Sequence, residues 1–223
     1  MFRNGYRAWL APSKVAYHVS DDGINWTQVG DFVFEVQQMP FFDDTALVTS
    51  AVVEADGTWT FYLALFSQSE EFVSGIARAT ATTPTSEWVV DEQLVLNTGP
   101  EGAWDSAAIV VSDVLRTDAG YEMYYAAYDD AGVWGIGRAT SADGIAWEKH
   151  NDPTTDSTAY AESDPVMVAE ADEAWENEIQ DPRITVVDGQ YVMLYTSYSA
   201  GRNAGFGLAV SADGLAWQRV ANN

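Results

Sequence analysis

Acidic residues recur at one position in the chain, upstream of aromatic residues that open hydrophobic segments. They are Asp44, Asp105 and Glu176, which precede Trp59, Tyr121 and Tyr191 by 15, 16 and 15 residues. If the fold brings such side chains together, one carboxyl can donate a proton while an ionised carboxylate accepts one or attacks, as in acid–base catalysis. The spacing therefore marks these three acids as candidates for a shared site.

Two further acids belong to the same hypothesis. Asp43 adjoins Asp44, and Asp181 lies in the segment IQDPR. The chain has 34 acidic residues, so an acid at any chosen position is common. An Asp beside a strand can also form a turn or accept a hydrogen bond from a neighbouring strand. Both interpretations stay open.

Charge is the most unusual property of the composition. The 34 acidic residues stand against 10 basic ones, which gives a formal net charge of −24. Nucleic acids and anionic membranes require a basic surface, so neither is expected as a partner. A solvated acidic surface accounts for the excess. A source that lives at high salt would explain both this excess and the scarcity of Lys.

Scarce residue types exclude other kinds of site. The chain has no Cys, which excludes disulfides, Cys-ligated zinc and a Cys nucleophile. His18 and His150 are too few and too distant in sequence for a zinc site, and no metal site is predicted. No apolar run reaches the ~18 residues of a membrane span. No signal peptide is visible, so a soluble protein is expected, in the cytoplasm or secreted.

A long internal repeat predicts the architecture. Residues 121–147 and 191–217 align without a gap at an offset of 70, with 13 of 27 positions identical. Both copies end in the motif SADGxAW, and SDDGINW at residues 20–26 is a third copy of that ending. Trp residues close the repeats at 26, 88, 147 and 217. Repeats of this length that are built of strands are typical of propeller blades.

The local pattern predicts four antiparallel strands in each repeat. Aromatic and β-branched residues dominate, and Asp-Gly pairs mark the hairpin turns. We therefore expect an all-β propeller in a single domain, 1–223, with blade units at about 1–30 (partial), 31–96, 97–153 and 154–223. The SxDGxxW motif is predicted to be a turn whose Trp packs between blades. One weak helical pattern lies within residues 165–178.

These residues resemble a known superfamily. The order W-D, first strand, D-G, YxMxY and GxGxATSxDGxxW is similar to the five-bladed propellers of arabinanases, invertases and levansucrases, which include glycoside hydrolase family 43. The segment IQDPRITVVDGQYVMLYTSYS also resembles the DPR strand of mannoside phosphorylases. The resemblance implies that three carboxylates from different first strands meet at the axis. Their separation would set the stereochemistry, at ~6.5–9.5 Å for inversion and ~5–5.5 Å for retention.

The resemblance also implies roles for particular residues. The catalytic candidates are Asp44, Asp105, Asp181 and Glu176, and the substrate-binding candidates are Trp104, Trp175, Arg183 and Asp43. The Trp side chains could stack on a sugar or simply pack within the fold. Arg183 could bind a sugar hydroxyl or a phosphate, or pair with a neighbouring acid. No cofactor is required, although the acids permit the calcium ion that some relatives hold.

The chain also departs from the superfamily pattern. Five blades of ~60 residues would need ~300 residues, and this chain has 223. The first repeat lacks its first strand, which in many relatives carries a catalytic Asp. A fragment of a longer protein, a smaller ring and completion by a partner subunit are three explanations. Exposed edge strands would favour self-association.

The leading functional hypothesis is a glycoside hydrolase that acts on a furanoside or related glycan through a carboxylate acid/base pair. One alternative is a glycoside phosphorylase. The other is a non-catalytic propeller that binds a glycan or a protein. A carbohydrate is the expected partner in the enzyme hypotheses.

Overall fold

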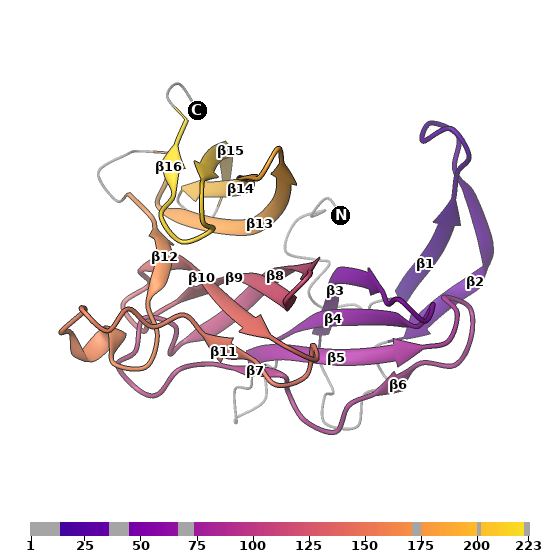
Figure 1. The fold of residues 1–223 in the computed structure, drawn as a ribbon, viewed down its shortest axis with the longest axis horizontal. Coiled ribbons are helices and arrows are strands. Elements are labelled where there is room, and N and C mark those ends of the chain that lie inside the picture. Colours follow the sequence, from indigo (N-terminus) through magenta and orange to yellow (C-terminus); the bar gives the residue numbers. More distant parts are fainter. Residues whose placement is uncertain (1–13, 36–44, 67–73, 171–174, 200–201, 221–223) are drawn as a thin grey trace. The chain divides into compact units, whose positions relative to one another are not determined.

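The computed structural model describes residues 14–35, 45–66, 74–170, 175–199 and 202–220 (Figure 1). Its described residues form strands and a single 3-10 turn, Thr158–Tyr160, so the all-β prediction is confirmed. The chain divides into two compact units, Met1–Leu94 and Val95–Asn223. This boundary falls beside the predicted junction between blade units 31–96 and 97–153.

The first unit contains two sheets. β1 (Lys14–Val19) and β2 (Thr27–Glu35) form an antiparallel pair. The second sheet has the order β3, β4, β5, β6, and its strands are β3 (Thr45–Val53), β4 (Trp59–Phe66), β5 (Ser74–Ala81) and β6 (Val89–Val90). The middle strand β4 is buried on both faces, because its sequence WTFYLALF places apolar or aromatic residues at nearly every position.

The second unit contains two further sheets, which we call blade 3 and blade 4. The strands of blade 3 are β8 (Ala108–Thr117), β9 (Gly120–Tyr128), β10 (Trp134–Ser141) and β11 (Glu148–Lys149), with β12 (Pro165–Val168) also paired to β10. Those of blade 4 are β13 (Glu178–Val187), β14 (Gln190–Ser199), β15 (Arg202–Ser211) and β16 (Gln218–Arg219). β7 (Leu96–Asn97) lies at the start of this unit.

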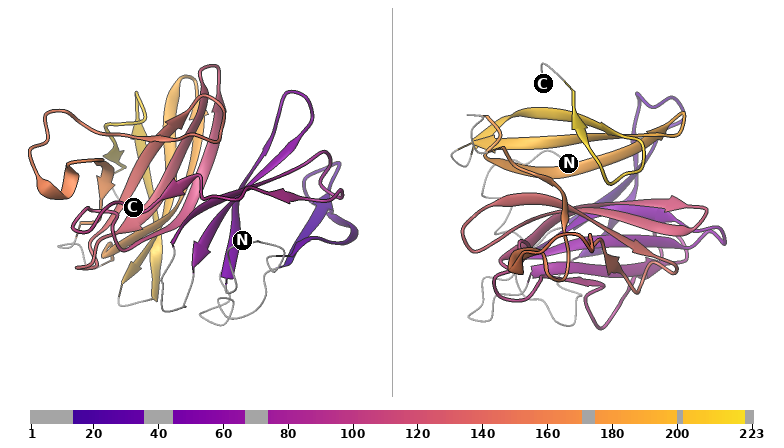
Figure 2. Two further views of the ribbon diagram at one scale, coloured as in Figure 1. Left: turned by 90° about the horizontal axis from the view of Figure 1, so that it is seen from below. Right: turned by 60° about the vertical axis from the view of Figure 1, so that its left-hand side comes forward.

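Blades 3 and 4 stack face to face, as the right-hand view of Figure 2 shows for the yellow and pink strands. Their shared core joins Tyr124 and Ile136 of blade 3 to Ile184 and Met193 of blade 4. Both blades are antiparallel and follow sequence order, as the repeat predicts. The offset of 70 residues therefore relates equivalent positions in two packed sheets.

The three SxDGxxW motifs form the same turn. In each copy the carboxylate of the Asp-Gly pair accepts hydrogen bonds from the backbone N–H groups two and three residues later. The Trp indole donates to the Gly carbonyl. The Gly residues take positive φ angles of 73° to 74°. Trp217 packs against Tyr124 of blade 3 and Tyr191 of blade 4, as expected for an anchor between blades.

One local expectation was wrong, namely the weak helical pattern within residues 165–178. Within residues 165–178, Pro165–Val168 forms strand β12 and not a helix, because its backbone pairs with β10 and Met167 is buried in the shared core. Tertiary pairing thus overrides a weak helical pattern.

Among the described residues, no helix has the length and apolar character needed to cross a bilayer.

Candidate active site

Asp105 lies in the turn that leads into β8. Its side chain is completely buried, and Oδ2 accepts a hydrogen bond from Lys149 Nζ at 2.6 Å. The Tyr125 hydroxyl also donates to Oδ2, at 3.4 Å. Burial, and then the charge of Asp105, raise the pKa of Tyr125 well above its usual value, so the phenol stays a donor. Asp105 therefore joins the start of the first strand to the second and fourth strands of blade 3.

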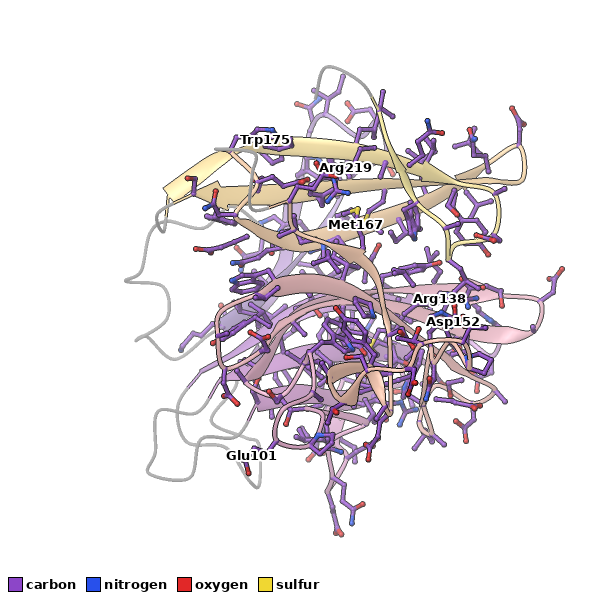
Figure 3. The ribbon with its side chains drawn as sticks, turned by 90° about the vertical axis from the view of Figure 1, so that its left-hand side faces the viewer. Glu101, Arg138, Asp152, Met167, Trp175 and Arg219 are labelled. Atoms are coloured by element: carbon purple, nitrogen blue, oxygen red, sulfur yellow. The ribbon has the colours of Figure 1, made fainter. Side chains whose placement is uncertain are left out.

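Glu176 has the same place in blade 4. It is completely buried, and Arg219 Nε lies 3.1 Å from Oε1 and 2.9 Å from Oε2. The Tyr195 hydroxyl donates to Oε1. Arg219 further donates to the Val168 carbonyl at 2.7 Å. Figure 3 shows Arg219 on blade 4, where it ties the incoming chain segment to the sheet.

The two sets are thus equivalent: an acid, a Tyr from the second strand and a base from the fourth strand. In each set the carboxylate joins the segment before the first strand to the fourth strand of its own blade. Action of Asp105 or Glu176 on a substrate stays a prediction. The sequence interpretation missed Lys149 and Arg219, although both stand two residues after the Trp of SADGxAW.

The two Trp candidates lie beside these acids. Trp104 is 5% exposed, donates from its indole to Ser163 Oγ at 3.0 Å and stacks on Tyr125. Trp175 is partly buried and packs against the core that blades 3 and 4 share (Figure 3). These contacts correspond to the packing interpretation of both residues. Stacking of either ring on a sugar stays a prediction.

Asp181 differs from the two buried acids because it is partly exposed and lies on a break in the strand. The β13–β14 ladder is interrupted between Gln180 and Arg183, so Asp181 and Pro182 oppose the single residue Tyr195. Asp181 has φ = 50°. This left-handed conformation is uncommon for a residue other than Gly, and such strain and such bulges concentrate at functional sites, where they redirect a side chain.

Arg183 lies two residues after Asp181 and is 44% exposed. Its Nη1 donates to the Ser112 carbonyl at 3.3 Å and lies 3.8 Å from Asp113 Oδ1. Asp113 Oδ2 accepts the Ile184 N–H at 2.8 Å. Burial raises the pKa of Asp113, although the Ile184 N–H and Arg183 oppose the shift. This network joins β8 to β13, and Asp113 was missed although it is the one acid in β8.

Asp43 and Asp44 lie outside the described residues, so their convergence with the other candidates stays a prediction. The described residues contain no group of three or more His, Asp or Glu side chains suited to a metal ion. The calcium ion that the resemblance permits stays a prediction, and no step below uses one.

A cavity of about 550 Å³ lies at the end of blade 3 that is remote from Asp105. Its walls include Tyr121, Glu122, Arg138 and Trp147. Glu122 pairs there with Arg138 at 3.0 Å and accepts the Tyr191 hydroxyl at 3.2 Å. None of the predicted site residues lines this cavity.

Known proteins resemble the chain in sequence and in fold. A beta-1,2-mannobiose phosphorylase of Thermoanaerobacter sp. (strain X514) is 29% identical over 118 residues, which are 47% of this chain and 34% of that protein. Among solved structures, a family 117 glycoside hydrolase of Zobellia galactanivorans has a TM-score of 0.70 at 17% identity and covers 93% of this chain. A thermostable family-43 glycoside hydrolase has a TM-score of 0.68 at 13% identity over 96% of this chain.

These structures confirm the predicted fold class, a β-propeller of the five-bladed type. The chain spans 34% of the curated relative, 55% of the family 117 structure and 66% of the family-43 structure. A family model described as beta-1,4-mannooligosaccharide phosphorylase matches residues 76–223, which include all of blades 3 and 4. By this match the chain belongs to glycoside hydrolase family 130.

Proposed function

We propose that the chain acts in the cleavage of β-mannosidic bonds with inorganic phosphate as the acceptor. The family description and the name of the curated relative, both mannoside phosphorylases, support this proposal. They favour the phosphorylase alternative over the hydrolysis of a furanoside. The carbohydrate-active character is common to both alternatives.

The observation that carries the proposal is the strained Asp181 beside Arg183. Asp181 combines φ = 50° with a place on the strand bulge, and its side chain is partly exposed. Arg183 is 44% exposed and presents the planar group that suits phosphate. A carboxyl and a guanidinium from one bulge supply an acid/base group and an anion-binding group.

The reaction balances with these two groups. A phosphate oxygen attacks the anomeric carbon as the bond to the leaving oxygen breaks, and the leaving oxygen takes a proton from the Asp181 carboxyl. Asp181 then regains a proton from the hydrogen phosphate group that has been transferred. The products are a mannosyl phosphate and a shortened sugar. Arg183 orients the phosphate and offsets its negative charge, which a strongly acidic chain would otherwise repel.

The experiment incubates the chain with β-1,4- and β-1,2-linked mannobiose, with and without phosphate, and measures mannosyl phosphate and free mannose. We expect mannosyl phosphate only when phosphate is present. Asp181→Asn should reduce the rate by ~10²-fold or more, within the range of acid–base catalysis. Asp188→Asn is a matched control, because Asp188 has φ = 51°, lies at the other end of β13 and is exposed.

Equal rates for the two variants would remove Asp181 from the site. Free mannose in the absence of phosphate would favour hydrolysis. Product from arabinans or fructans but from neither mannobiose would restore the furanoside hypothesis.

A second candidate is a propeller that binds glycans without cleaving them. It is favoured because Asp105 and Glu176 are fully buried in ion pairs, which leaves Asp181 as the described catalytic candidate that a substrate can reach. Saturable binding of mannobiose by calorimetry, together with no product under any condition above, would support this candidate and reject the enzyme.

A further inference from the structure

Asp113 is an acid on the face of blade 3 that turns toward blade 4. It pairs with Tyr124 across β8 and β9, and Tyr124 belongs to the core that the two blades share. Residues paired in this way direct their side chains to the same face of a sheet. The Asp113 side chain is only 17% exposed. A carboxylate in such a place needs hydrogen bonds to offset its lost hydration, so its partners indicate its role.

Asp113 binds the strand β13 directly after the bulge. Its Oδ2 accepts the Ile184 N–H at 2.8 Å, although Ile184 belongs to blade 4. Adjacent residues of an antiparallel strand direct their N–H groups to opposite edges, and this donor is one that the ladder with β14 leaves over. The carboxylate thus acts in place of a neighbouring strand and fixes β13 to blade 3.

The bulge itself depends on what surrounds it. Asp181 has φ = 50°, and Asp181 and Pro182 together oppose Tyr195. Such a conformation persists only where contacts on several sides determine it. Pairing with β14 resumes at Arg183, whereas the Asp113 carboxylate binds the next residue from blade 3. The backbone that carries Asp181 is therefore held from both blades.

The Arg183 side chain meets the same acid. Its Nη1 lies 3.8 Å from Asp113 Oδ1 and donates to the Ser112 carbonyl at 3.3 Å. Asp113 and Arg183 are equivalent positions of blades 3 and 4, because their ladder partners lie 70 residues apart, at Tyr124 and Leu194. Blade 3 thus has an acid where blade 4 has a base. Unlike the SxDGxxW turn, this contact is not copied by the repeat, as expected for a group that is needed once per site.

We propose that Asp113 is a positioning residue for the cleavage reaction. Its carboxylate holds the segment that carries Asp181, the proton donor, and Arg183, the phosphate ligand. This inference rests on the proposed function, which assigns those two roles. The bond to the Ile184 N–H is the decisive one, because it fixes the backbone and with it both side chains. A displacement of about 1 Å can reduce a rate by ~10²-fold.

The test compares Asp113→Ala, which removes the acceptor, with Asp113→Asn, which keeps an oxygen for the Ile184 N–H. Both are assayed with mannobiose and phosphate. In Asp113→Ala we expect kcat to fall by ~10- to 10²-fold and KM for phosphate to rise, with KM for mannobiose little changed. Asp113→Asn should recover most of both losses. Asp118→Ala is the control, since it removes an exposed acid from the turn that follows β8.

Hydrogen exchange of the Ile184 amide, followed by NMR, tests the anchor without the reaction. The amide should exchange slowly in the unchanged chain and in Asp113→Asn. It should exchange at least ~10-fold faster in Asp113→Ala, with the amides of β14 unaffected, because a single hydrogen bond is lost. If Asp113→Ala does not fold, Asp113→Leu replaces it, since Leu has similar branching and no acceptor.

Three results would overturn the proposal. They are unchanged kcat in Asp113→Ala, equal losses in Asp113→Ala and Asp113→Asn, and a lower unfolding temperature with kcat per folded molecule unchanged, which would make the role of Asp113 structural. The absence of mannosyl phosphate from the unchanged chain would reject the proposed function and with it this role in the reaction. The exchange of Ile184 would still decide whether Asp113 holds the bulge.

Discussion

Blades 3 and 4 each pair a buried acid before the first strand with a cation from the fourth strand, but the acid and the cation differ between them. Asp105 meets Lys149 through a single oxygen, and Glu176 meets Arg219 through both. Among the described residues Asp105 Oδ1 is buried without a hydrogen-bond partner, whereas both oxygens of Glu176 accept hydrogen bonds. Arg219 Nε points between the two oxygens of Glu176, whereas Lys149 Nζ contacts one oxygen of Asp105.

The comparison distinguishes the ion pair, which both blades share, from the unpaired carboxylate oxygen, which belongs to the acid of blade 3. In both blades a buried acid joins the segment before the first strand to the fourth strand, so this pairing is common to the two blades. A buried unsatisfied oxygen costs ~1–3 kcal/mol, and only blade 3 bears this cost. Of the two buried acids, Asp105 is the one with an oxygen left for another partner.

The largest expected change in the free energy of unfolding comes from removing the charge of Glu176 or Asp105. It tests whether the two ion pairs differ in their contribution to stability. Glu176→Gln removes one of the two counter-ions of Arg219, which keeps Glu170 at 3.0 Å, and should lower the free energy of unfolding by ~1.5–3 kcal/mol. Asp105→Asn should cost less, because only one oxygen of Asp105 accepts hydrogen bonds whereas both oxygens of Glu176 do. Urea denaturation of both variants measures the difference. A larger loss for Asp105→Asn would contradict the contrast.

The Tyr of each set requires a Gly opposite it, and this provides the second test. A Cβ at Gly207 would lie 2.0 Å from Tyr195 Cζ, and one at Gly137 would lie 2.4 Å from Tyr125 Cζ. Gly207→Ala and Gly137→Ala should each destabilise the chain by ~1–3 kcal/mol through overpacking. Thermal unfolding should show the larger loss for Gly207→Ala, where the approach is closer.

The first unit suggests how to relieve this clash. There the equivalent pair is Leu63 and Ala77, which face each other across β4 and β5. Tyr125→Leu should therefore recover part of the stability lost in Gly137→Ala, since it recreates that pair. Simple addition of the two single losses in the double variant would show that the Tyr ring is not what excludes a side chain at 137.

The smallest expected change in the free energy of unfolding concerns the Asp residues of the SxDGxxW turns. Hydrogen bonds from the backbone of Ala216 and Leu215 lower the pKa of Asp213 from 3.8 to about 2, and those of Asn25 and Ile24 lower the pKa of Asp22 further. A carboxyl with a lowered folded-state pKa stabilises the fold above its unfolded pKa, and this contribution is lost as pH falls through the folded pKa. We expect it to fade between about pH 4 and pH 2.

Above about pH 4, Asp213→Asn should lower the free energy of unfolding more than Asp22→Asn does, because it also loosens a docked turn. The Asp213 turn is docked on blade 3 through Gly214 and Trp217, whereas the Asp22 turn is exposed. Unfolding monitored by tryptophan fluorescence across this pH range measures both variants. An equal effect would mean that docking does not depend on the turn.

Sequence periodicity predicted the strands well, because a repeat copies local propensity and turn chemistry together. The alignment of residues 121–147 with 191–217 placed the second and third strands of blades 3 and 4, and the Asp-Gly pairs placed their turns. The shortness of the predicted fourth strands and the pairing of β12 with β10 were not foreseen. They depend on long-range hydrogen bonds, which leave no periodic signal.

By itself, the sequence determined the blade register and the acids that open each repeat, since both follow from residue type and spacing. Only the tertiary structure decided what surrounds those acids. Asp105 and Glu176 are buried beside Lys149 and Arg219, which lie more than 40 residues away in the chain. Asp181 is partly exposed on a strained bulge. Burial and counter-ions arise from packing between distant segments, so spacing alone could not separate a scaffold acid from a candidate for catalysis.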